Sequence, residues 1–194
     1  LMTIRHLMTH SAGFPEDNPW GDRQLADTEE DLVALIKNQL SLSNTAGLEY
    51  EYSNLGFAML GYIIHKVSGL TYDTYIAKNI LAPLSMQGTS FEYTDVPKNL
   101  FANGYRYIND QWRIEQPLKN GIYGAMGGMI TSIDMFSKYV ALHEDAWPAR
   151  DDAETFPIKR SSLREMHQPA FFIGLNPNTI FPSGKKMATT SSYS

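Results

Sequence analysis

The chain has 194 residues, which is enough for one domain with a hydrophobic core. Its 43% hydrophobic and 19% charged residues are typical of a soluble globular protein, and a net charge of −5 without a basic run disfavours a nucleic-acid partner. The chain has no cysteine, which excludes disulfides, a thiol nucleophile and thiolate metal sites but does not fix the compartment.

The N-terminal part of the chain predicts two helices with a loop between them. A short helix is expected over Thr3–Thr9, because the threonine at its start can cap the first turn. The segment Phe14–Ala26 holds prolines and a glycine, which favours a loop. Thr28 and Asp31 resemble a capping box, and apolar residues at helical spacing extend this second helix to Leu40.

The segment that ends at Gly69 gives the strongest structural signal in the chain. After Tyr52, Ser53 and Asn54, the run Leu55–Ile64 is almost entirely apolar, and four more residues precede Gly69. A buried helix of about four turns is therefore expected. Ser53 or Asn54 can cap its first turn, and Gly69 fits its end. The apolar run is too short to cross a bilayer, which takes about 20 residues.

The next segments predict a helix, a hairpin and a loop. Apolar side chains of Tyr72–Leu81 share one helical face, and Pro83 ends this helix. Within Asn103–Ile114 the apolar period changes to two, and Asn109-Asp110 supplies turn chemistry, so a hairpin is expected. Gly121–Gly128 is rich in glycine and is expected to be a loop with unusual backbone angles or close approach.

A further helix follows this glycine-rich segment. Thr131 or Ser132 is expected to cap it, and it runs through Leu142. The residues expected to face inward are Ile133, Phe136 and Val140.

The remainder of the chain is less regular. Glu144–Pro157 is charged and holds two prolines, which favours a surface loop. Ser162 and Glu165 form a second capping-box pattern ahead of a short helix. The tail Phe171–Ser194 shows no clear period. The predicted fold class is mainly α with small antiparallel β, in one domain without internal repeats.

Tyr52, Ser53 and Asn54 bring a phenol, a hydroxyl and an amide to the start of a rigid helix. On their own, these residues are also what an ordinary helix cap contains. A phenol is a poor base in water because its pKa is near 10, and it becomes useful where a neighbouring cation favours the phenolate.

Four segments, in the same order, resemble the serine β-lactamase-related family, which includes class C β-lactamases, penicillin-binding DD-peptidases and related esterases. The segments are Thr3–Gly13, Tyr52–Ile64, Ile80–Met86 and Gly124–Met135. The resemblance extends from about Leu1 to about Tyr139. It implies the helical region of the β-lactamase/transpeptidase-like fold, and a bacterial periplasmic or extracellular location, although no signal peptide is visible.

The resemblance also implies roles for two residues. Tyr52 falls on the family's tyrosine, which acts as general base for a nucleophilic serine and as proton donor to the leaving group. Asn54 falls on the family's asparagine, which donates an amide hydrogen bond to the substrate. Ser53 occupies the variable middle position and is expected only to cap the helix.

Two parts of the family pattern have no counterpart in this sequence. The S-x-x-K motif, which carries the nucleophile and one lysine, would precede Leu1, and no K-T-G or H-x-G triplet is present. Ser183-Gly184-Lys185-Lys186 fits the letters alone, because it follows Tyr52 whereas the family order is the reverse. Residues 1–194 are therefore expected to be an incomplete domain that is inactive alone.

Two interpretations remain open. In the first, the chain is part of a serine hydrolase that opens small-molecule amides, lactams, esters or peptides through an acyl-serine intermediate, without a cofactor. In the second, it is a non-catalytic binding module with the same fold. Because the chain offers few strands to cover the apolar helix, an exposed apolar patch near Tyr52 and Gly124–Gly128, with self-association, is expected.

Other candidate motifs are weaker. His6 and His10 have the i, i+4 spacing of zinc-binding histidines, but Leu7 stands in place of the glutamate and no third ligand is evident. Ser11 lacks the preceding glycine of a nucleophile elbow, since Thr9 occupies that position. Gly124–Gly128 lacks the lysine of a phosphate-binding loop.

Overall fold

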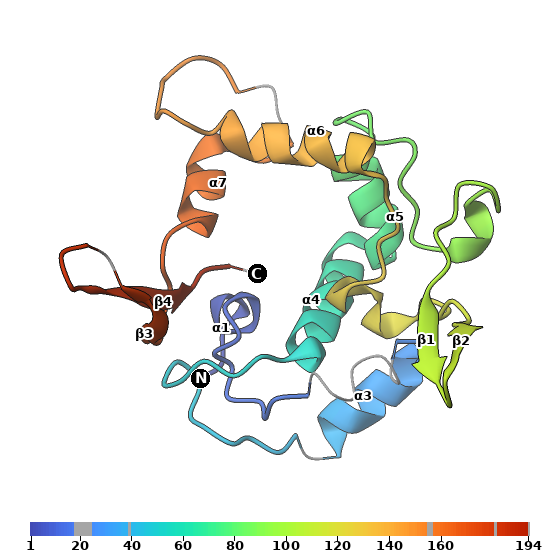
Figure 1. Ribbon diagram of the computed structural model, residues 1–194, viewed down its shortest axis with the longest axis horizontal. Helices are drawn as coiled ribbons and strands as arrows, with labels where there is room; N and C mark the ends of the chain where they lie inside the picture. The colour runs from blue at the N-terminus through green and yellow to red at the C-terminus, as the bar shows by residue number, and fades with distance from the viewer. Residues whose placement is uncertain (18–24, 39, 155–156, 181, 194) are drawn as a thin grey trace.

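Helix caps fix the start of most helices in the computed structural model, which describes residues 1–17, 25–38, 40–154, 157–180 and 182–193. The α-helices are α1 (Ile4–Met8), α3 (Glu29–Lys37), α4 (Asn54–Ser68), α5 (Tyr72–Ile76), α6 (Ile133–Glu144) and α7 (Arg160–Met166). In Figure 1, α4, α5, α6 and α7 follow one another around the molecule, and α1 lies beside α4. The described part of the chain is thus mainly helical, as predicted.

The two N-terminal helices begin where the sequence predicts. Thr3 caps α1, and the side chain of His6 completes this capping box by accepting the Thr3 N–H. Thr28 and Asp31 form the predicted capping box of α3, which ends at Lys37 instead of extending to Leu40. Residues 18–24 of the predicted loop between these helices lie outside the described residues.

Helix α4 is the helix that the sequence predicts between Ser53 and Gly69. Ser53 caps it by accepting the Gly56 N–H at 3.1 Å, and Gly69 ends it in a left-handed conformation at φ 72°. Its Gly61 faces Ala125 of the short 3₁₀ helix η3 (Ile122–Met126), so the two backbones come close together. The Gly121–Gly128 segment, predicted as a loop, therefore contains a helical turn that packs on α4.

The core consists of four small clusters and not of one large one. Two of them involve α4, which packs against α1 on one side and against α3 and η3 on the other. The other two join α5, α6 and α7. Their fully buried large side chains are Phe14, Leu32, Met86, Tyr123 and Leu163.

The helix predicted over Tyr72–Leu81 forms in two parts. After α5, residues Ala77–Leu81 form a π-helical turn, η1, and the chain then turns at Ala82. A short 3₁₀ helix, η2 (Tyr93–Asp95), follows. The π-turn was not predicted, because its hydrogen bonds differ from those of an α-helix by one residue only and leave no clear sequence signal.

Helix α6 begins at Ser132 as predicted, but its predicted inward face is wrong. Ile133 is 85% exposed, and Phe136 and Val140 are exposed too. Met135, Tyr139 and Leu142 pack inward instead. Both sets of residues lie at helical spacing, so α6 has two apolar stripes, and its neighbours decide which is buried.

The capping box predicted at Ser162 and Glu165 is also wrong. Helix α7 begins earlier, after Lys159, and no side chain caps it in the usual way. The carboxylate of Glu154 instead accepts the N–H of Arg160 at 2.9 Å, which satisfies one of the free N–H groups of the first turn. Ser162 therefore lies inside the helix. Of the loop predicted over Glu144–Pro157, residues 155 and 156 lie outside the described residues.

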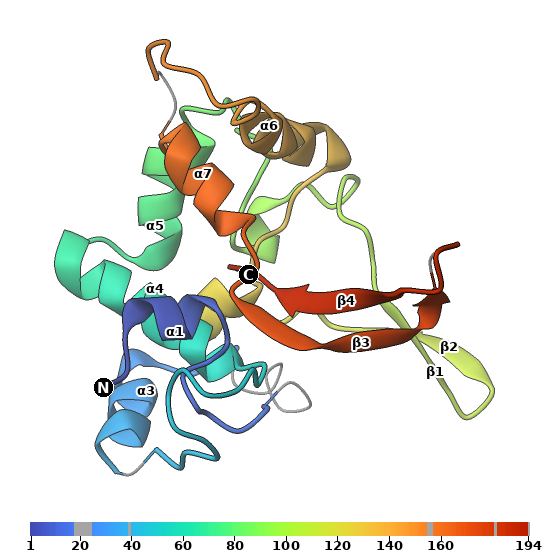
Figure 2. The ribbon, with the colours of Figure 1, turned by 90° about the vertical axis from the view of Figure 1, so that its left-hand side faces the viewer.

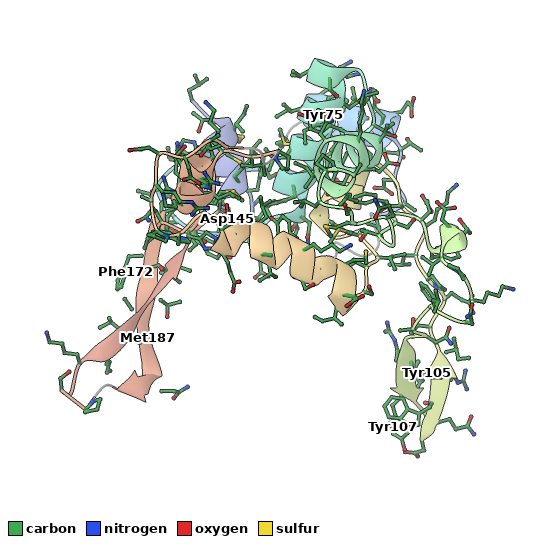
Figure 3. All side chains as sticks on the ribbon, turned by 90° about the horizontal axis from the view of Figure 1, so that it is seen from above. Tyr75, Tyr105, Tyr107, Asp145, Phe172 and Met187 are labelled. Atoms are coloured by element: carbon green, nitrogen blue, oxygen red, sulfur yellow. The ribbon has the colours of Figure 1, made fainter. Side chains whose placement is uncertain are left out.

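Two antiparallel hairpins complete the fold. The first pairs β1 (Tyr105–Ile108) with β2 (Gln111–Ile114) through Asn109 and Asp110, both at positive φ, as the turn chemistry predicts. The second pairs β3 (Phe171–Ile180) with β4 (Lys186–Ser191). Irregularities in its register account for the missing period of the tail. Both hairpins project away from the helices (Figures 2 and 3).

No helix in the described ranges is long and apolar enough to cross a membrane.

Candidate active site

Tyr52 and Asn54 lie together at the N-terminus of α4, as the sequence predicts. The Tyr52 hydroxyl donates to the Asn54 side-chain oxygen over 3.3 Å. Asn54 is buried and Tyr52 is half-buried. Because Asn54 is the first residue of a helix with a side-chain cap, its position is well determined. The phenol and the amide can therefore act on one bound group.

Asp17, which lies in the segment between α1 and α3, binds the N-terminus of α4. One of its carboxylate oxygens accepts the Asn54 N–H at 2.7 Å, and the other accepts the Leu55 N–H at 2.9 Å. The Ser53 hydroxyl donates to Asp17 over 3.4 Å and accepts the Gly56 N–H. Asp17 and Ser53 thus satisfy free N–H groups of the first turn, and the carboxylate also complements the helix dipole.

His10 contacts the segment that contains Tyr52. Its carbonyl accepts the Glu51 N–H at 2.8 Å, and its ring Nδ1 accepts the Ser53 N–H at 3.0 Å. The His10 ring lies 4.5 Å from the Tyr52 ring and 5.1 Å from the Phe57 ring, tilted by 32° in both cases. Tyr52 is thus placed by bonds to both of its neighbours and by a ring contact.

Burial lowers the pKa of His10, and the nearby Asp17 carboxylate opposes this shift. The imidazole is therefore neutral at physiological pH. Since Nδ1 accepts a hydrogen bond from Ser53, the proton of the neutral ring lies on Nε2.

An open hollow of about 410 Å³ lies beside Tyr52. It is lined by Glu16, Tyr50, Glu51 and Tyr52, so none of its described lining residues is basic. Burial raises the pKa of Tyr50, and the proximity of Tyr52 and Glu16 adds to this rise. The charged side chains among these described lining residues are therefore the carboxylates of Glu16 and Glu51.

Of the weaker candidates of the sequence, His10 contacts this site, but the described residues show neither the zinc site nor the nucleophile elbow. Nδ1 of His6 accepts the Thr3 N–H at 3.3 Å, and Nδ1 of His10 is bonded to Ser53. Within the described residues, no group of three His, Asp or Glu side chains is placed to hold a metal ion. Ser11 is buried beside Thr9.

Ser183 lies in the turn between β3 and β4, away from the start of any helix. A nucleophilic serine of the S-x-x-K type sits at a helix start, where its lysine is one turn away. The Ser183–Lys186 segment therefore does not have the geometry of that motif.

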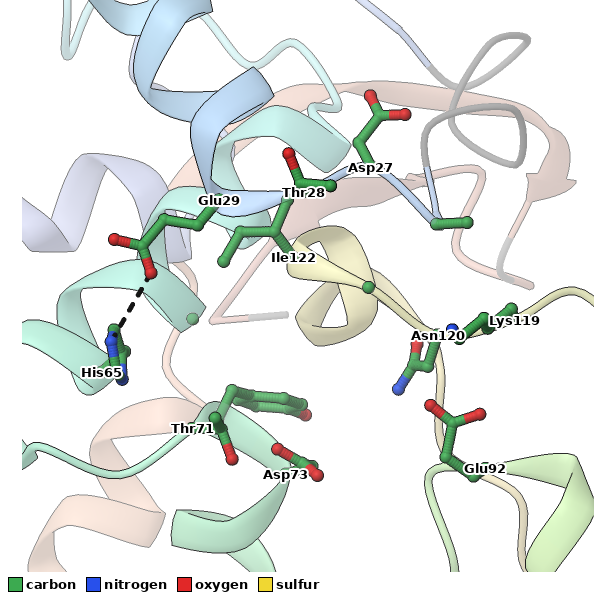
Figure 4. Close-up of a pocket in the computed structure, with 14 residues that line it drawn as sticks. Asp27, Thr28, Glu29, His65, Thr71, Asp73, Glu92, Lys119, Asn120 and Ile122 are labelled. Carbon is green, nitrogen blue, oxygen red and sulfur yellow. Dashed lines mark ion pairs between the residues drawn. The ribbon is translucent and has the colours of Figure 1, made fainter.

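A larger, more acidic pocket of about 460 Å³ lies two turns further along α4, at Gly61 and His65 (Figure 4). Its carboxylates are those of Asp27, Glu29, Asp73 and Glu92, and Lys119 lies at its edge. Glu29 pairs with His65 at 3.5 Å and with Lys66 at 2.6 Å. Neither Tyr52 nor Asn54 lines it, so the predicted site and the larger pocket are separate.

The sequence predicts Tyr52 and Asn54 as site residues, which stays a prediction, but it does not predict that Asp17 and His10 hold them in place. Asp17 lies in a predicted loop, and His10 stands out in the sequence only by its zinc-like spacing from His6. Because the N-terminus of a helix favours a nearby anion, the predicted start of α4 could have indicated a carboxylate near Asn54. Nothing in the sequence indicated which carboxylate.

Comparisons with known proteins agree with this fold. The family model described as Beta-lactamase matches residues 1–185. Beta-lactamase-like protein 4 of Dictyostelium discoideum is 27% identical over 180 residues, which is 87% of this chain and 31% of that protein. The chain spans less than a third of the length of the curated relatives it matches.

Solved structures are similar over nearly the whole chain. The octameric penicillin-binding protein homologue from Pyrococcus abyssi has a TM-score of 0.71 at 27% identity, over 99% of this chain and 42% of that one. The D-amino acid amidase from Ochrobactrum anthropi SV3, complexed with L-phenylalanine amide, has a TM-score of 0.65 at 21% identity, over 99% of this chain and 52% of that one. The second likeness concerns the fold alone.

Proposed function

The chain belongs to the β-lactamase family, whose model covers residues 1–185, and from this premise we propose that it is the helical part of a serine hydrolase. The parent protein opens an amide, lactam or ester bond through an acyl-serine intermediate. Tyr52 is the general base for the serine and the proton donor to the leaving group, and Asn54 orients the substrate.

The observation that carries this proposal is the pairing of Tyr52 with Asn54 at the start of α4. The Asn54 side-chain oxygen accepts from the Tyr52 hydroxyl, which leaves the amide nitrogen of Asn54 free to donate to a substrate carbonyl. A phenol that can exchange a proton thus lies beside a donor that can hold the substrate. Both are placed by helix α4 and by the contacts of His10 and Asp17.

The nucleophile and the cation come, in this proposal, from the parent outside residues 1–194. Ser183 lies in a hairpin turn, and the described residues that line the hollow beside Tyr52 are two glutamates and two tyrosines. A phenol acts as a base only beside a cation, and in this proposal a lysine of the parent supplies that cation. The chain alone is then inactive.

A fluorescent penicillin and a fluorophosphonate test this proposal directly. We expect no covalent label on residues 1–194 and stoichiometric label on one serine of the full-length parent, located by peptide mapping. Label on any serine of the 194-residue chain would overturn the claim that the nucleophile lies elsewhere.

The acidic lining of the hollow also favours a second candidate, a non-catalytic binding module with the same fold. The described lining contains Glu16 and Glu51 but no basic residue, whereas a tyrosine that acts as general base needs a neighbouring cation. In this case the full-length parent lacks an S-x-x-K serine and takes no covalent label. It still binds a penicillin reversibly, which equilibrium dialysis of the unreacted compound detects.

A further inference from the structure

We propose that His10 is a positioning residue for Tyr52: its backbone carbonyl and its ring Nδ1 hold the residues on both sides of the tyrosine, and its ring packs against the tyrosine ring. The proposal rests on the proposed function only in taking Tyr52 as the working group. The contacts themselves do not depend on what the parent protein does.

The first observation is the placement of the two hydrogen bonds. His10 uses its backbone carbonyl for the Glu51 N–H and its ring for the Ser53 N–H, at 2.8 and 3.0 Å. Glu51 and Ser53 are the immediate neighbours of Tyr52. One residue therefore fixes the backbone before and after the tyrosine, which leaves the Tyr52 side chain little freedom to move relative to Asn54.

The second observation is the backbone of His10. Its φ is 52°, in the left-handed region that favours glycine and that residues with a Cβ adopt infrequently. This conformation directs the carbonyl and the ring of His10 to the same short segment. A strained residue persists where its surroundings hold it in place, and such residues cluster at functional sites.

The third observation is the ring environment. His10 is 3% exposed, and its ring contacts the rings of Tyr50, Tyr52 and Phe57. Asp17 is the charged group that acts on it electrostatically. Protonation of Nδ1 would remove the lone pair that accepts the Ser53 N–H, so an imidazolium cannot keep this contact. The position of Tyr52 is therefore coupled to the charge of His10.

A core histidine without this role would tolerate any side chain of similar size. Two substitutions distinguish a positioning role of His10 from a role that only fills space in the core. His10→Asn keeps an acceptor close to the position of Nδ1 and tolerates the left-handed backbone. His10→Phe keeps the ring and the volume but has no acceptor for the Ser53 N–H. Positioning predicts that asparagine rescues the site and phenylalanine does not, whereas space filling predicts the opposite order.

The first measurement needs no substrate. In the 194-residue chain with ¹⁵N-labelled histidine, we expect the His10 signals of the Nε2–H tautomer. With ¹³Cζ-labelled tyrosine, the Tyr52 resonance is expected to shift during acidification at the pH where His10 titrates. The shift is expected to vanish in His10→Asn, which has no imidazole. An Nδ1–H tautomer, or a Tyr52 resonance indifferent to His10 titration, would overturn the proposal.

The second measurement uses the full-length parent. Displacement of a catalytic group by about 1 Å costs roughly 10²-fold in rate. His10→Phe is therefore expected to slow acylation by roughly 10²-fold, mainly through kcat. His10→Asn is expected to acylate at close to the wild-type rate, and its acylation rate should fall less steeply at acidic pH. Normal acylation by His10→Phe contradicts the proposal. If His10→Phe does not fold, the pH profile of acylation by His10→Asn tests the proposal by itself. An acid limb unchanged from the wild type would then contradict the positioning role of His10.

The two hypotheses fail in different ways. If neither the wild-type parent nor its variants take an acyl label, the proposed hydrolase function is contradicted. The Nε2–H tautomer of His10 and the Tyr52 shift that follows its titration would still support the positioning role. A labelled parent with a Tyr52 signal independent of His10 contradicts the positioning role alone.

Discussion

The carboxylate of Asp17 accepts the backbone N–H of Asn54 at 2.7 Å, across 37 residues of sequence. The same carboxylate accepts the next N–H of the helix, at Leu55. A residue of the N-terminal loop thus completes the first turn of α4 and fixes Asn54, which is the proposed substrate-binding residue.

We predict that Asp17→Ala destabilises the protein by about 1–2 kcal/mol, the upper part of the range for a lost helix N-cap. The reason is that two N–H groups of α4 lose their acceptor and the helix dipole loses its complementary charge. Urea unfolding of the chain measures the change. Glu16→Ala is the matched control: it removes an exposed carboxylate one residue away and should change the free energy of unfolding by less than about 0.5 kcal/mol. Equal effects of the two substitutions would contradict the role of Asp17.

In the full-length parent, Tyr52→Phe is predicted to slow acylation by roughly 10² to 10⁴, because the ring packing remains and the hydroxyl is lost. Stopped-flow acylation by a chromogenic substrate measures the rate. Tyr50→Phe serves as the control, since Tyr50 lines the same hollow and contacts His10 without contributing a proposed proton. Near-normal acylation by Tyr52→Phe would assign Tyr52 a structural role.

The start and end of α4 could be predicted because their signals are local. Ser53 and Gly69 lie next to the helix they delimit, and the apolar run between them is continuous. The residues that hold the site could not be predicted in this way. His10 reaches Ser53 across 43 residues, and such a contact depends on how α1 packs against α4.

The inward face of α6 could not be predicted for a related reason. The stripe with Ile133 and the stripe with Leu142 both satisfy the helical period, so periodicity alone cannot rank them. Packing against Leu84 and Leu163 selects the second stripe. The exposure of Ile133 thus depends on tertiary packing and cannot be predicted from the local sequence pattern.

Gly61→Ala is predicted to destabilise the chain by about 1–3 kcal/mol, the usual cost of an overpacked contact. A Cβ at Gly61 would lie 2.8 Å from the Cβ of Ala125, so α4 and η3 would have to move apart. Gly56→Ala in the same helix is the control, because its Cβ would meet only ordinary contacts at 3.7 Å or more. Thermal unfolding of both variants measures the difference, and a Gly61→Ala variant as stable as Gly56→Ala would contradict the close packing of η3.

The stability of the chain is predicted to fall as the pH drops below about 6.5. Burial lowers the pKa of His10 from its ordinary value of 6.5, so between the folded and the unfolded pKa the unfolded state binds more protons. The stabilisation by neutral His10 is therefore present above pH 6.5 and is lost as the pH falls through the folded pKa. Burial and the nearby His167 also lower the pKa of His143, which acts in the same direction.

Urea unfolding between pH 7 and pH 5 measures this dependence. His10→Asn is expected to flatten the slope in part, and His143→Gln to flatten it further. The two substitutions are expected to be additive, because the histidines belong to different core regions. A slope that is unchanged in His10→Asn would show that His10 does not carry a depressed pKa.

The last prediction concerns the surface of the chain. Helix α4 is apolar on nearly every side, yet most of its large apolar residues are half-buried rather than buried. These residues are Leu55, Phe57, Met59, Leu60, Tyr62, Ile63 and Ile64. Exposed apolar patches beyond a few hundred Å² are unusual for a soluble monomer. We therefore expect such a patch near Tyr52 and Gly124–Gly128, and self-association through it.

Light scattering and binding of a hydrophobic dye to the purified chain measure both consequences. The expected result is a mass that rises with concentration, together with dye fluorescence that falls when α4 is made more polar. Met59→Gln tests the helix itself, and Trp112→Gln is the control, because Trp112 is 70% exposed on the projecting β1–β2 hairpin, away from α4. A dye-silent monomer with a sharp, cooperative melt would contradict the prediction, since it would require the chain to cover α4 by itself.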